Sequence, residues 1–130
     1  MIKLSWVLQI LCAVILAQTL YFKFSGAPES VWIFSRLGME PWGRYLTGGL
    51  ELVAVLLLLV PRTIWMGATL AGGLMLGAII SHLAVLGVVV IGPDGRGDGG
   101  LLFSLAAIDG LFAAAVLWIR RDSIPFLARE

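Results

Sequence analysis

Four long apolar segments dominate this chain, at about residues 4–24, 42–60, 63–91 and 100–119. An α-helix needs about 20 mostly apolar residues to cross the hydrocarbon core of a bilayer, which is ≈ 30 Å thick. Inside that core each segment must satisfy its own backbone hydrogen bonds, which a helix does. Short connections between spans favour antiparallel neighbours. The segments therefore predict an all-α integral membrane protein, a four-helix up-down-up-down bundle.

Composition and charge exclude several other classes of protein. The 130 residues are 60% hydrophobic and only 13% charged, whereas a soluble domain carries about 25% charged residues. A chain of this length forms a single domain, with too little interior to hide so much apolar surface from water. A soluble enzyme is therefore nearly excluded. The net charge of +1 offers no basic surface for nucleic acid, and one cysteine, Cys12, excludes an internal disulfide.

The third segment is too long for a straight crossing. Its roughly 29 residues would span ~43 Å, so we expect the helix to tilt or to break near Gly87. Small residues recur at every fourth position in the last two segments, which would let helix backbones approach closely. They are Gly73, Gly77 and Ser81 in the third segment and Ala106, Gly110 and Ala114 in the fourth. We interpret them as packing faces; the alternative is chance, because Gly and Ala are abundant here.

The loop at 25–41, between the first two segments, is not polar. Pro28-Glu29 is typical of a helix start and Gly38 of a helix stop, with apolar residues at helical spacing between them. We expect a short interfacial helix in this first external loop, anchored by Trp32. This helix either shields lipid from water or caps a pocket.

The second external loop, at 92–100, is rich in glycine. Asp94 and Asp98 suggest a calcium loop, but Arg96 occupies a ligand position between them and no Glu closes the loop. Asp98 is better explained as the N-cap of the fourth helix.

An even number of spans places both termini on one side of the membrane. Five basic residues would lie on that side, namely Lys3, Arg62, Arg120, Arg121 and Arg129, and four on the other, namely Lys23, Arg36, Arg44 and Arg96. Basic residues concentrate on the cytoplasmic side of membrane proteins. We therefore expect a multi-pass protein of the cell membrane with both termini in the cytoplasm.

We select six polar or charged side chains, within the four segments or beside them, as candidates for a buried site. They are Gln18 and Lys23 in the first, Arg44 and Glu51 in the second, His82 in the third and Asp109 in the fourth. Charges at membrane depth cost roughly 2.5–3.5 kcal/mol each and usually face protein. At 1.5 Å per residue, four of the six fall roughly 9–14 Å beneath the outer surface, with Lys23 and Arg44 just above them. We expect one buried polar cluster.

The cluster has a functional and a structural interpretation. As a functional site, Glu51 and His82 would carry protons, Asp109 would orient His82, and Lys23 or Arg44 would hold an anionic or carbonyl oxygen. Such a pocket suits the head group of a quinone-like ligand or a proton relay. As a structural network, the same charges would only set helix register. A single His excludes bis-histidine haem from this chain alone, and mixed ligands on separate helices are a weak zinc signal. We expect no metal.

Several short motifs follow one another along the chain in a fixed order. They are Tyr21-Phe22-Lys23-Phe24-Ser25-Gly26, Gly48-Gly49-Leu50-Glu51-Leu52 leading to Pro61-Arg62, Met75 through Gly77-Ala78-Ile79 to His82-Leu83, and Asp98-Gly99-Gly100. In this order and spacing the chain resembles the DoxX and DoxX-like membrane protein family, over about residues 4–119.

The resemblance implies a four-helix membrane protein. Some relatives are associated with thiosulfate:quinone oxidoreduction or with membrane complexes that handle thiol and oxidative stress. It also implies that Lys23, Glu51 and His82 are the recurrent polar positions of the family, without an established catalytic role. This chain has no cysteine pair, so a thiol-exchange role would need the thiols of a partner.

Three functions remain open at this point. The leading hypothesis is a redox-associated membrane subunit that binds a quinone-like or other small amphipathic ligand at the polar cluster. The second is a structural scaffold that docks a membrane partner protein without any ligand. The third is an oligomeric transporter of small solutes or protons, although no helix is broken at mid-membrane. The expected partners are the lipid bilayer, a membrane or redox partner protein and further copies of the chain.

Overall fold

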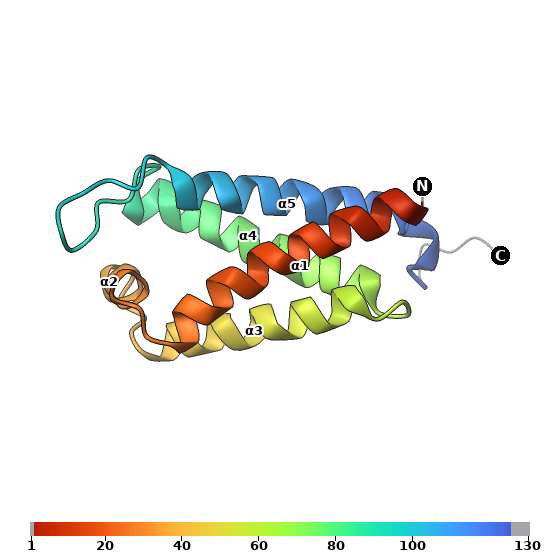
Figure 1. Cartoon of the computed structure of the whole chain (residues 1–130), viewed down its shortest axis with the longest axis horizontal. Helices are drawn as coiled ribbons and strands as arrows, with labels where there is room; N and C mark the ends of the chain where they lie inside the picture. Colours follow the sequence, from red (N-terminus) through yellow and green to blue (C-terminus); the bar gives the residue numbers. More distant parts are fainter. Residues whose placement is uncertain (1, 126–130) are drawn as a thin grey trace.

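The computed structural model describes residues 2–125, and its main elements are helices (Figure 1). In chain order these are α1 (Ile2–Phe24), α2 (Pro28–Arg36), α3 (Trp42–Leu59), α4 (Ile64–Ser81), a π-helical turn η1 (His82–Leu86), α5 (Leu101–Ile119) and a 3-10 turn η2 (Arg121–Ser123). The four long helices are apolar enough to cross a membrane, with the third span running from Ile64 to Leu86. The predicted all-α membrane bundle is confirmed.

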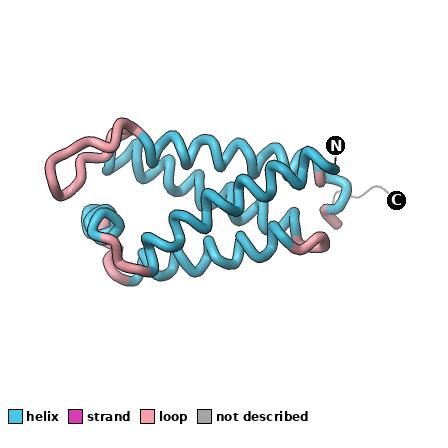
Figure 2. The backbone as a smooth tube through the Cα atoms, viewed as in Figure 1, coloured by secondary structure: helices cyan, strands magenta, loops and turns pink. Residues whose placement is uncertain are grey.

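The long helices alternate in direction and form a four-helix bundle. Both α1 and α4 pack against α3 and α5. The beginning of α1, the turn at 60–63 and the end of α5 lie at one end of the bundle, which we call the terminal end (Figure 1). The opposite end holds α2 and the loop at 87–100, and we call it the α2 end. Loops are confined to these two ends (Figure 2).

Small side chains fill the interior of the bundle. Besides Cys12 and Leu16, the fully buried core includes Ala54 of α3, Ala68 and Ala71 of α4, and Ala113 of α5. At Gly67 the α4 backbone touches α3, because a Cβ there would lie 2.6 Å from the Leu58 amide nitrogen. In lipid the hydrophobic effect does not drive helices together, so such close backbone approach stabilises the bundle by van der Waals contact.

Of the two predicted packing faces, the one on α5 packs within the chain and the one on α4 does not. On α5, Ala106 is buried and a Cβ at Gly110 would lie 3.4 Å from Met75, so this part of the face packs within the chain. On α4, a Cβ at Gly73 or Gly77 would meet nothing within 4 Å. The α4 face therefore points away from the bundle, because α4 packs through the face that carries Gly67, Ala68 and Ala71 instead.

The third span ends at Leu86, not at the predicted residue 91. Gly87 has a φ of +79°, which a side chain other than that of glycine rarely adopts, and it stops the helix. The β-branched run that follows is not helical: the chain bends at Val88 and Val89, and Ile91 forms an isolated bridge with Gly97. Of the two expected ways to accommodate the long segment, the break near Gly87 is confirmed.

The short helix predicted in the first loop is present as α2. It begins at Pro28, where the missing N–H of proline does no harm. The helix runs across the end of the bundle rather than along it, as an interfacial helix lies (Figures 1 and 2). Phe34 is its buried residue.

Candidate functional site

An ion pair between Lys23 and Glu51 lies inside the bundle near the α2 end. The Lys23 ammonium donates to Glu51 Oε1 at 2.7 Å, and the Thr19 hydroxyl donates to Glu51 Oε2 at 3.0 Å. Thr19 and Lys23 are one helical turn apart on α1, so one face of that helix presents both donors to α3. Glu51 is 1% exposed, and the Lys23 side chain is 15% exposed. The pair is shielded, and Lys23 keeps limited access from outside.

Arg44 joins the ends of α1 and α3. Its guanidinium donates to both carboxylate oxygens of Glu40, at 3.0 and 3.1 Å, and it lies over the Tyr45 ring. It also donates to the backbone carbonyl of Lys23, one of the last-turn carbonyls that a helix leaves without an internal partner. Arg44 is therefore engaged in holding helix ends together, whereas the sequence suggested it as a ligand-holding group.

His82 lies in the π-helical turn, away from Asp109. Its Nδ1 is 2.9 Å from the carbonyl oxygen of Gly87, and its ring meets Phe103 of α5 edge-on. His82 is buried. The expected orientation of His82 by Asp109 is not observed, because this turn directs the imidazole toward the chain reversal at Gly87.

Asp98 anchors the loop that leads into α5. Its carboxylate accepts hydrogen bonds from the backbone N–H groups of Gly100 (2.8 Å), Val90 (3.0 Å) and Leu102 (3.2 Å). Partial burial opposes the charge, but these three donors and the nearby His82 outweigh it and hold the pKa of Asp98 below its usual value. The N-cap of α5 is Gly100, not Asp98. The carboxylate nevertheless binds the first turn of α5, as the sequence predicted.

Asp109 is fully buried in the middle of α5. Neither of its carboxylate oxygens has a hydrogen-bond partner in the part of the chain that the structure describes. The Cys12 thiol of α1, without a hydrogen bond of regular geometry, and Glu51 of α3 are both near enough to interact with it electrostatically. Asp109 of α5 therefore has its electrostatic neighbours on α1 and α3.

Gln18 does not join the buried groups, because it is exposed on α1. The inward face of that helix contains Ser5, Gln9, Cys12 and Leu16, which recur every three or four residues. Gln18 is two residues beyond Leu16, so it points to nearly the opposite side of the helix. The predicted single cluster is therefore divided. Lys23 and Glu51 form an ion pair, Arg44 joins the helix ends, His82 lies in the π-helical turn, and Asp109 lies in the middle of α5.

A second polar network, missed from the sequence, lies at the terminal end. Arg120 donates to Ser5 Oγ at 2.9 Å and to Gln9 Oε1 at 3.2 Å. Gln9 donates through Nε2 to the carbonyl oxygen of Leu58 at 2.9 Å. Ser5 and Gln9 are fully buried. The spacing of Ser5, Gln9 and Cys12 on one face of α1 is the signal that could have found them.

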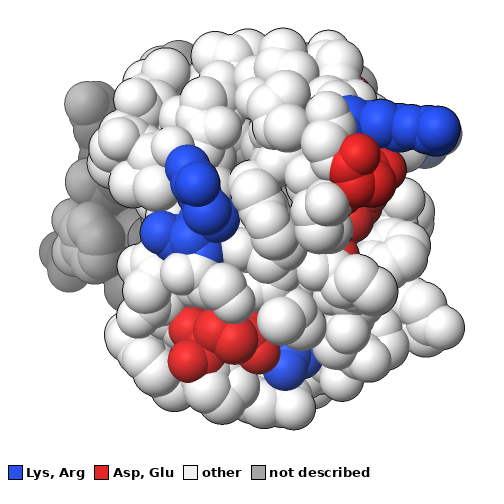
Figure 3. Space-filling model, turned by 90° about the vertical axis from the view of Figure 1, so that its left-hand side faces the viewer, with Lys and Arg blue, Asp and Glu red and all other residues white. Residues whose placement is uncertain are grey.

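A cleft opens at the α2 end between α2 and the glycine-rich loop. Its volume is about 240 Å³, and its walls include Trp32 and Ile33 of α2, Val90 and Asp98 of the loop, and Leu102 of α5. Figure 3 views this end, where charged side chains gather in a few places on an otherwise uncharged surface. One of its wall residues, Asp98, interacts electrostatically with His82, which itself lies outside the lining.

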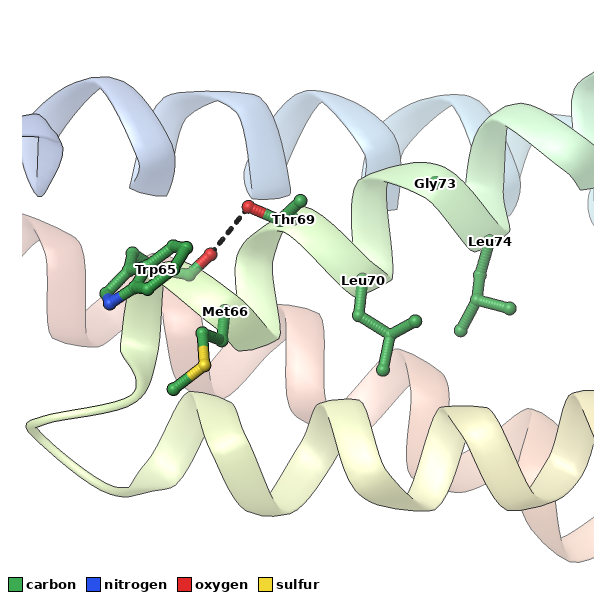
Figure 4. Close-up of a pocket in the computed structure, with 6 residues that line it drawn as sticks. All are labelled: Trp65, Met66, Thr69, Leu70, Gly73 and Leu74. Carbon is green, nitrogen blue, oxygen red and sulfur yellow. Dashed lines mark hydrogen bonds between the residues drawn. The ribbon is translucent and has the colours of Figure 1, made fainter. Parts of the chain in front are cut away.

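A shallow apolar groove of about 440 Å³ runs along the outside of α4 (Figure 4). It is lined by Trp65, Met66, Thr69, Leu70, Gly73 and Leu74. The Thr69 hydroxyl donates to the Trp65 carbonyl of its own helix, so the groove presents an almost wholly apolar surface.

The family model described as DoxX-like matches residues 7–92. The chain belongs to the DoxX-like family. With its four apolar helices, this DoxX-like chain is a multi-pass membrane protein that inserts into a lipid bilayer. The matched segment contains Lys23, Glu51 and His82 but ends before α5, so Asp109 and Arg120 lie outside it. No curated protein and no solved structure matches the chain.

Proposed function

We propose that this DoxX-like protein is a redox-associated subunit of the cell membrane that binds a quinone-like or other small amphipathic ligand at its α2 end. The observation that carries this proposal is the Lys23–Glu51 ion pair, shielded within the bundle. Charged side chains at membrane depth are rare and mark functional sites more often than other residues do. As a stability device the pair is poor, because desolvation can offset its Coulomb attraction.

The α2 end of the bundle, where the pair lies, also contains a cleft that could hold part of such a ligand. Binding sites for small molecules are mostly apolar, with a few polar groups that fix orientation. The cleft beside α2 has apolar walls at Trp32, Ile33 and Leu102. Its other walls include the charged side chains of Glu29, Asp94, Arg96 and Asp98, whereas Lys23, Glu51 and His82 lie outside its lining. Its volume of about 240 Å³ has room for a head group, while an apolar tail would remain among the lipids.

In this proposal each polar residue has a separate role. Lys23 donates a hydrogen bond to a carbonyl or anionic oxygen of the ligand, and Glu51 and His82 exchange protons with it. Arg44 positions Lys23 through the backbone carbonyl that it binds. The α2 end would face the outside of the cell, with both termini in the cytoplasm, in keeping with the small excess of basic residues on the terminal side.

The test is native mass spectrometry of the gently extracted protein beside its Glu51→Gln and His82→Ala variants. We expect a small molecule bound to the wild type and lost from both variants. Asp122→Asn is the control, since Asp122 is an exposed carboxylate at the terminal end and should leave the ligand in place. Bare wild-type protein, or a ligand retained equally by all variants, would refute the proposal.

The α4 groove favours a second candidate, a scaffold that docks a partner protein. Gly73 and Gly77 leave open space on the lipid-facing side of α4, and faces of small residues let helices of separate chains approach closely in lipid. Under this alternative, Gly77→Leu should abolish co-purification of a stoichiometric partner. Gly49→Leu is the matched control, because Gly49 of α3 also has open space beside it. If the partner persists in Gly77→Leu, this alternative fails.

A further inference from the structure

The inward face of α1 has polar side chains at both ends of the bundle, with the core residues Cys12, Ala13 and Leu16 between them. Along this face lie Ser5, Gln9, Cys12, Thr19 and Lys23, interrupted by Leu16. Their spacing of three, four or seven residues keeps them on one side of the helix. We call these five residues the α1 polar face. The rest of the bundle interior is packed by apolar side chains, so polar groups on this face are not needed for packing.

Hydrogen bonds connect both ends of the α1 polar face to other helices. At the terminal end, Ser5 and Gln9 accept from Arg120 of α5. At the α2 end, Thr19 and Lys23 donate to Glu51 of α3. Each membrane surface is therefore linked to a hydrogen-bonded network that extends into the bundle.

Asp109 lies between the two networks, beside Cys12. It is 0% exposed, and among residues 2–125 no group donates a hydrogen bond to its carboxylate oxygens. An ionised carboxylate buried without a donor or counter-ion costs several kcal/mol, whereas a neutral carboxyl costs far less. Buried carboxyl groups with a purely structural role accept hydrogen bonds. Asp109 accepts none of regular geometry, so we interpret it as a group that binds a proton.

The titratable neighbours of Asp109 define where that proton can go. Cys12 faces it from α1 and Glu51 from α3. The helix α4, which also packs on α5, contains no titratable side chain. Glu51 is thus the one described carboxylate near Asp109, and its own partner Lys23 is partly accessible from the α2 end.

We propose that Asp109 binds and releases a proton at the centre of the bundle, and that the α1 polar face transfers protons between the two membrane surfaces. A proton reaches Glu51 when the Lys23 pair opens, and the Glu51 carboxyl passes it to the ionised form of Asp109. Asp109 then releases it to water that enters from the terminal end, where Gln9 and Ser5 offer hydrogen-bonding groups. Only O–H bonds form and break, one proton leaves for each that enters, and no electron is transferred.

The test uses the purified full chain in phospholipid vesicles that contain a pH-sensitive dye and no quinone. A potassium gradient with valinomycin drives protons inward. We expect wild-type vesicles to acidify faster than protein-free vesicles, Asp109→Asn to abolish the difference, and Asp109→Glu to retain part of it. Asp122→Asn makes the same chemical change at an exposed carboxylate and should acidify like the wild type.

Two results would overturn the proposal, namely wild-type vesicles no faster than protein-free ones, or Asp109→Asn as fast as the wild type. Infrared spectroscopy of the wild type keeps the proposal testable even if the Asp109→Asn variant fails to fold. It should show the carbonyl stretch of a neutral buried carboxyl, and its absence from the wild type would also contradict the proposal. Because no ligand is added, this test is independent of the ligand site proposed above.

Discussion

The two ends of the bundle each contain a buried polar network, yet the networks differ in charge. At the α2 end, Lys23 pairs with Glu51 and Arg44 with Glu40, so each cation faces an acid. At the terminal end, the cation Arg120 is held by the neutral side chains of Ser5 and Gln9, with the Trp6 ring nearby.

This difference separates two roles. An acid–base pair can exchange a proton or open to accept a ligand, because its charges can be redistributed. Neutral groups around an arginine can only hold it or pass hydrogen bonds along. Through Gln9 the terminal network links α1, α3 and α5. We infer that the terminal end fixes the positions of the helices and the α2 end carries the exchangeable charge.

The largest effect should come from breaking the Lys23–Glu51 pair on one side. Glu51→Leu leaves a buried ammonium without a counter-charge and should destabilise the protein by about 3–5 kcal/mol. The double variant Lys23→Met/Glu51→Leu removes both charges and should recover most of that loss, while still failing to bind ligand. Unfolding in detergent measures both free energies. A double variant as unstable as Glu51→Leu would show that the pair serves structure.

The matched change at the terminal end is Gln9→Leu. It removes one acceptor of Arg120 and one donor to Leu58, and unsatisfied buried groups cost about 1–3 kcal/mol. We expect lower stability in the same unfolding assay, with the native mass spectrum still showing bound ligand. Loss of the ligand in a folded Gln9→Leu protein would contradict the division of roles between the two ends.

Acid should weaken the α2 end through Asp98. Because the pKa of Asp98 is lower in the folded state than its ordinary 3.8, its stabilisation is complete above about pH 4 and is lost as the pH falls through the folded pKa. Asp98→Asn should lower the melting temperature at neutral pH by an amount equivalent to about 1 kcal/mol, because hydrogen bonds to a charged acceptor are worth about that much more than hydrogen bonds to a neutral one.

The same variant should also have a flatter melting profile than the wild type below pH 4. Melting temperatures of the two proteins across a pH series measure this difference. Parallel profiles for the wild type and Asp98→Asn would show that Asp98 does not contribute as described.

The smallest effect is expected from Gln18→Leu, the counterpart of Gln9→Leu on the opposite side of α1. Gln18 is exposed on the outward side of a membrane span, where an apolar side chain is favoured over a polar one, so we expect no loss of stability. The pair of variants compares the two faces of one helix with an identical chemical change. A loss from Gln18→Leu as large as that from Gln9→Leu would indicate a partner on the exposed face of α1.

The sequence predicted the architecture well because length and hydropathy determine membrane spans. It also located the break at Gly87 and the attachment of Asp98 to α5, since each depends on the chemistry of nearby residues. The polar cluster was predicted less accurately, because counting residues from a helix end gives depth but not rotation. Gln18 has the right depth and the wrong side of α1.

Other parts of the site could not be predicted from the sequence. Arg44 has an acid four residues earlier, Glu40, and this local pair takes up its guanidinium. His82 and Asp109 belong to adjacent helices, but the π-helical turn directs His82 toward Gly87. In the sequence, Arg120 is interpreted as a charged residue that ends a helix. Its contact with Ser5 depends on the packing of α5 on α1 and is found only in the structure.

The four spans are unequal in length, which ties this protein to the thickness of its bilayer. The span of α1 and the span formed by α4 with η1 have 23 residues each, against 18 in α3 and 19 in α5, or about 35 Å compared with about 28 Å. A span longer than the hydrocarbon core accommodates the mismatch by tilting, and α1 does run obliquely across the bundle (Figure 1). A thinner bilayer would tilt α1 further and move Ser5 and Lys23, at its two ends, relative to their partners on α3 and α5.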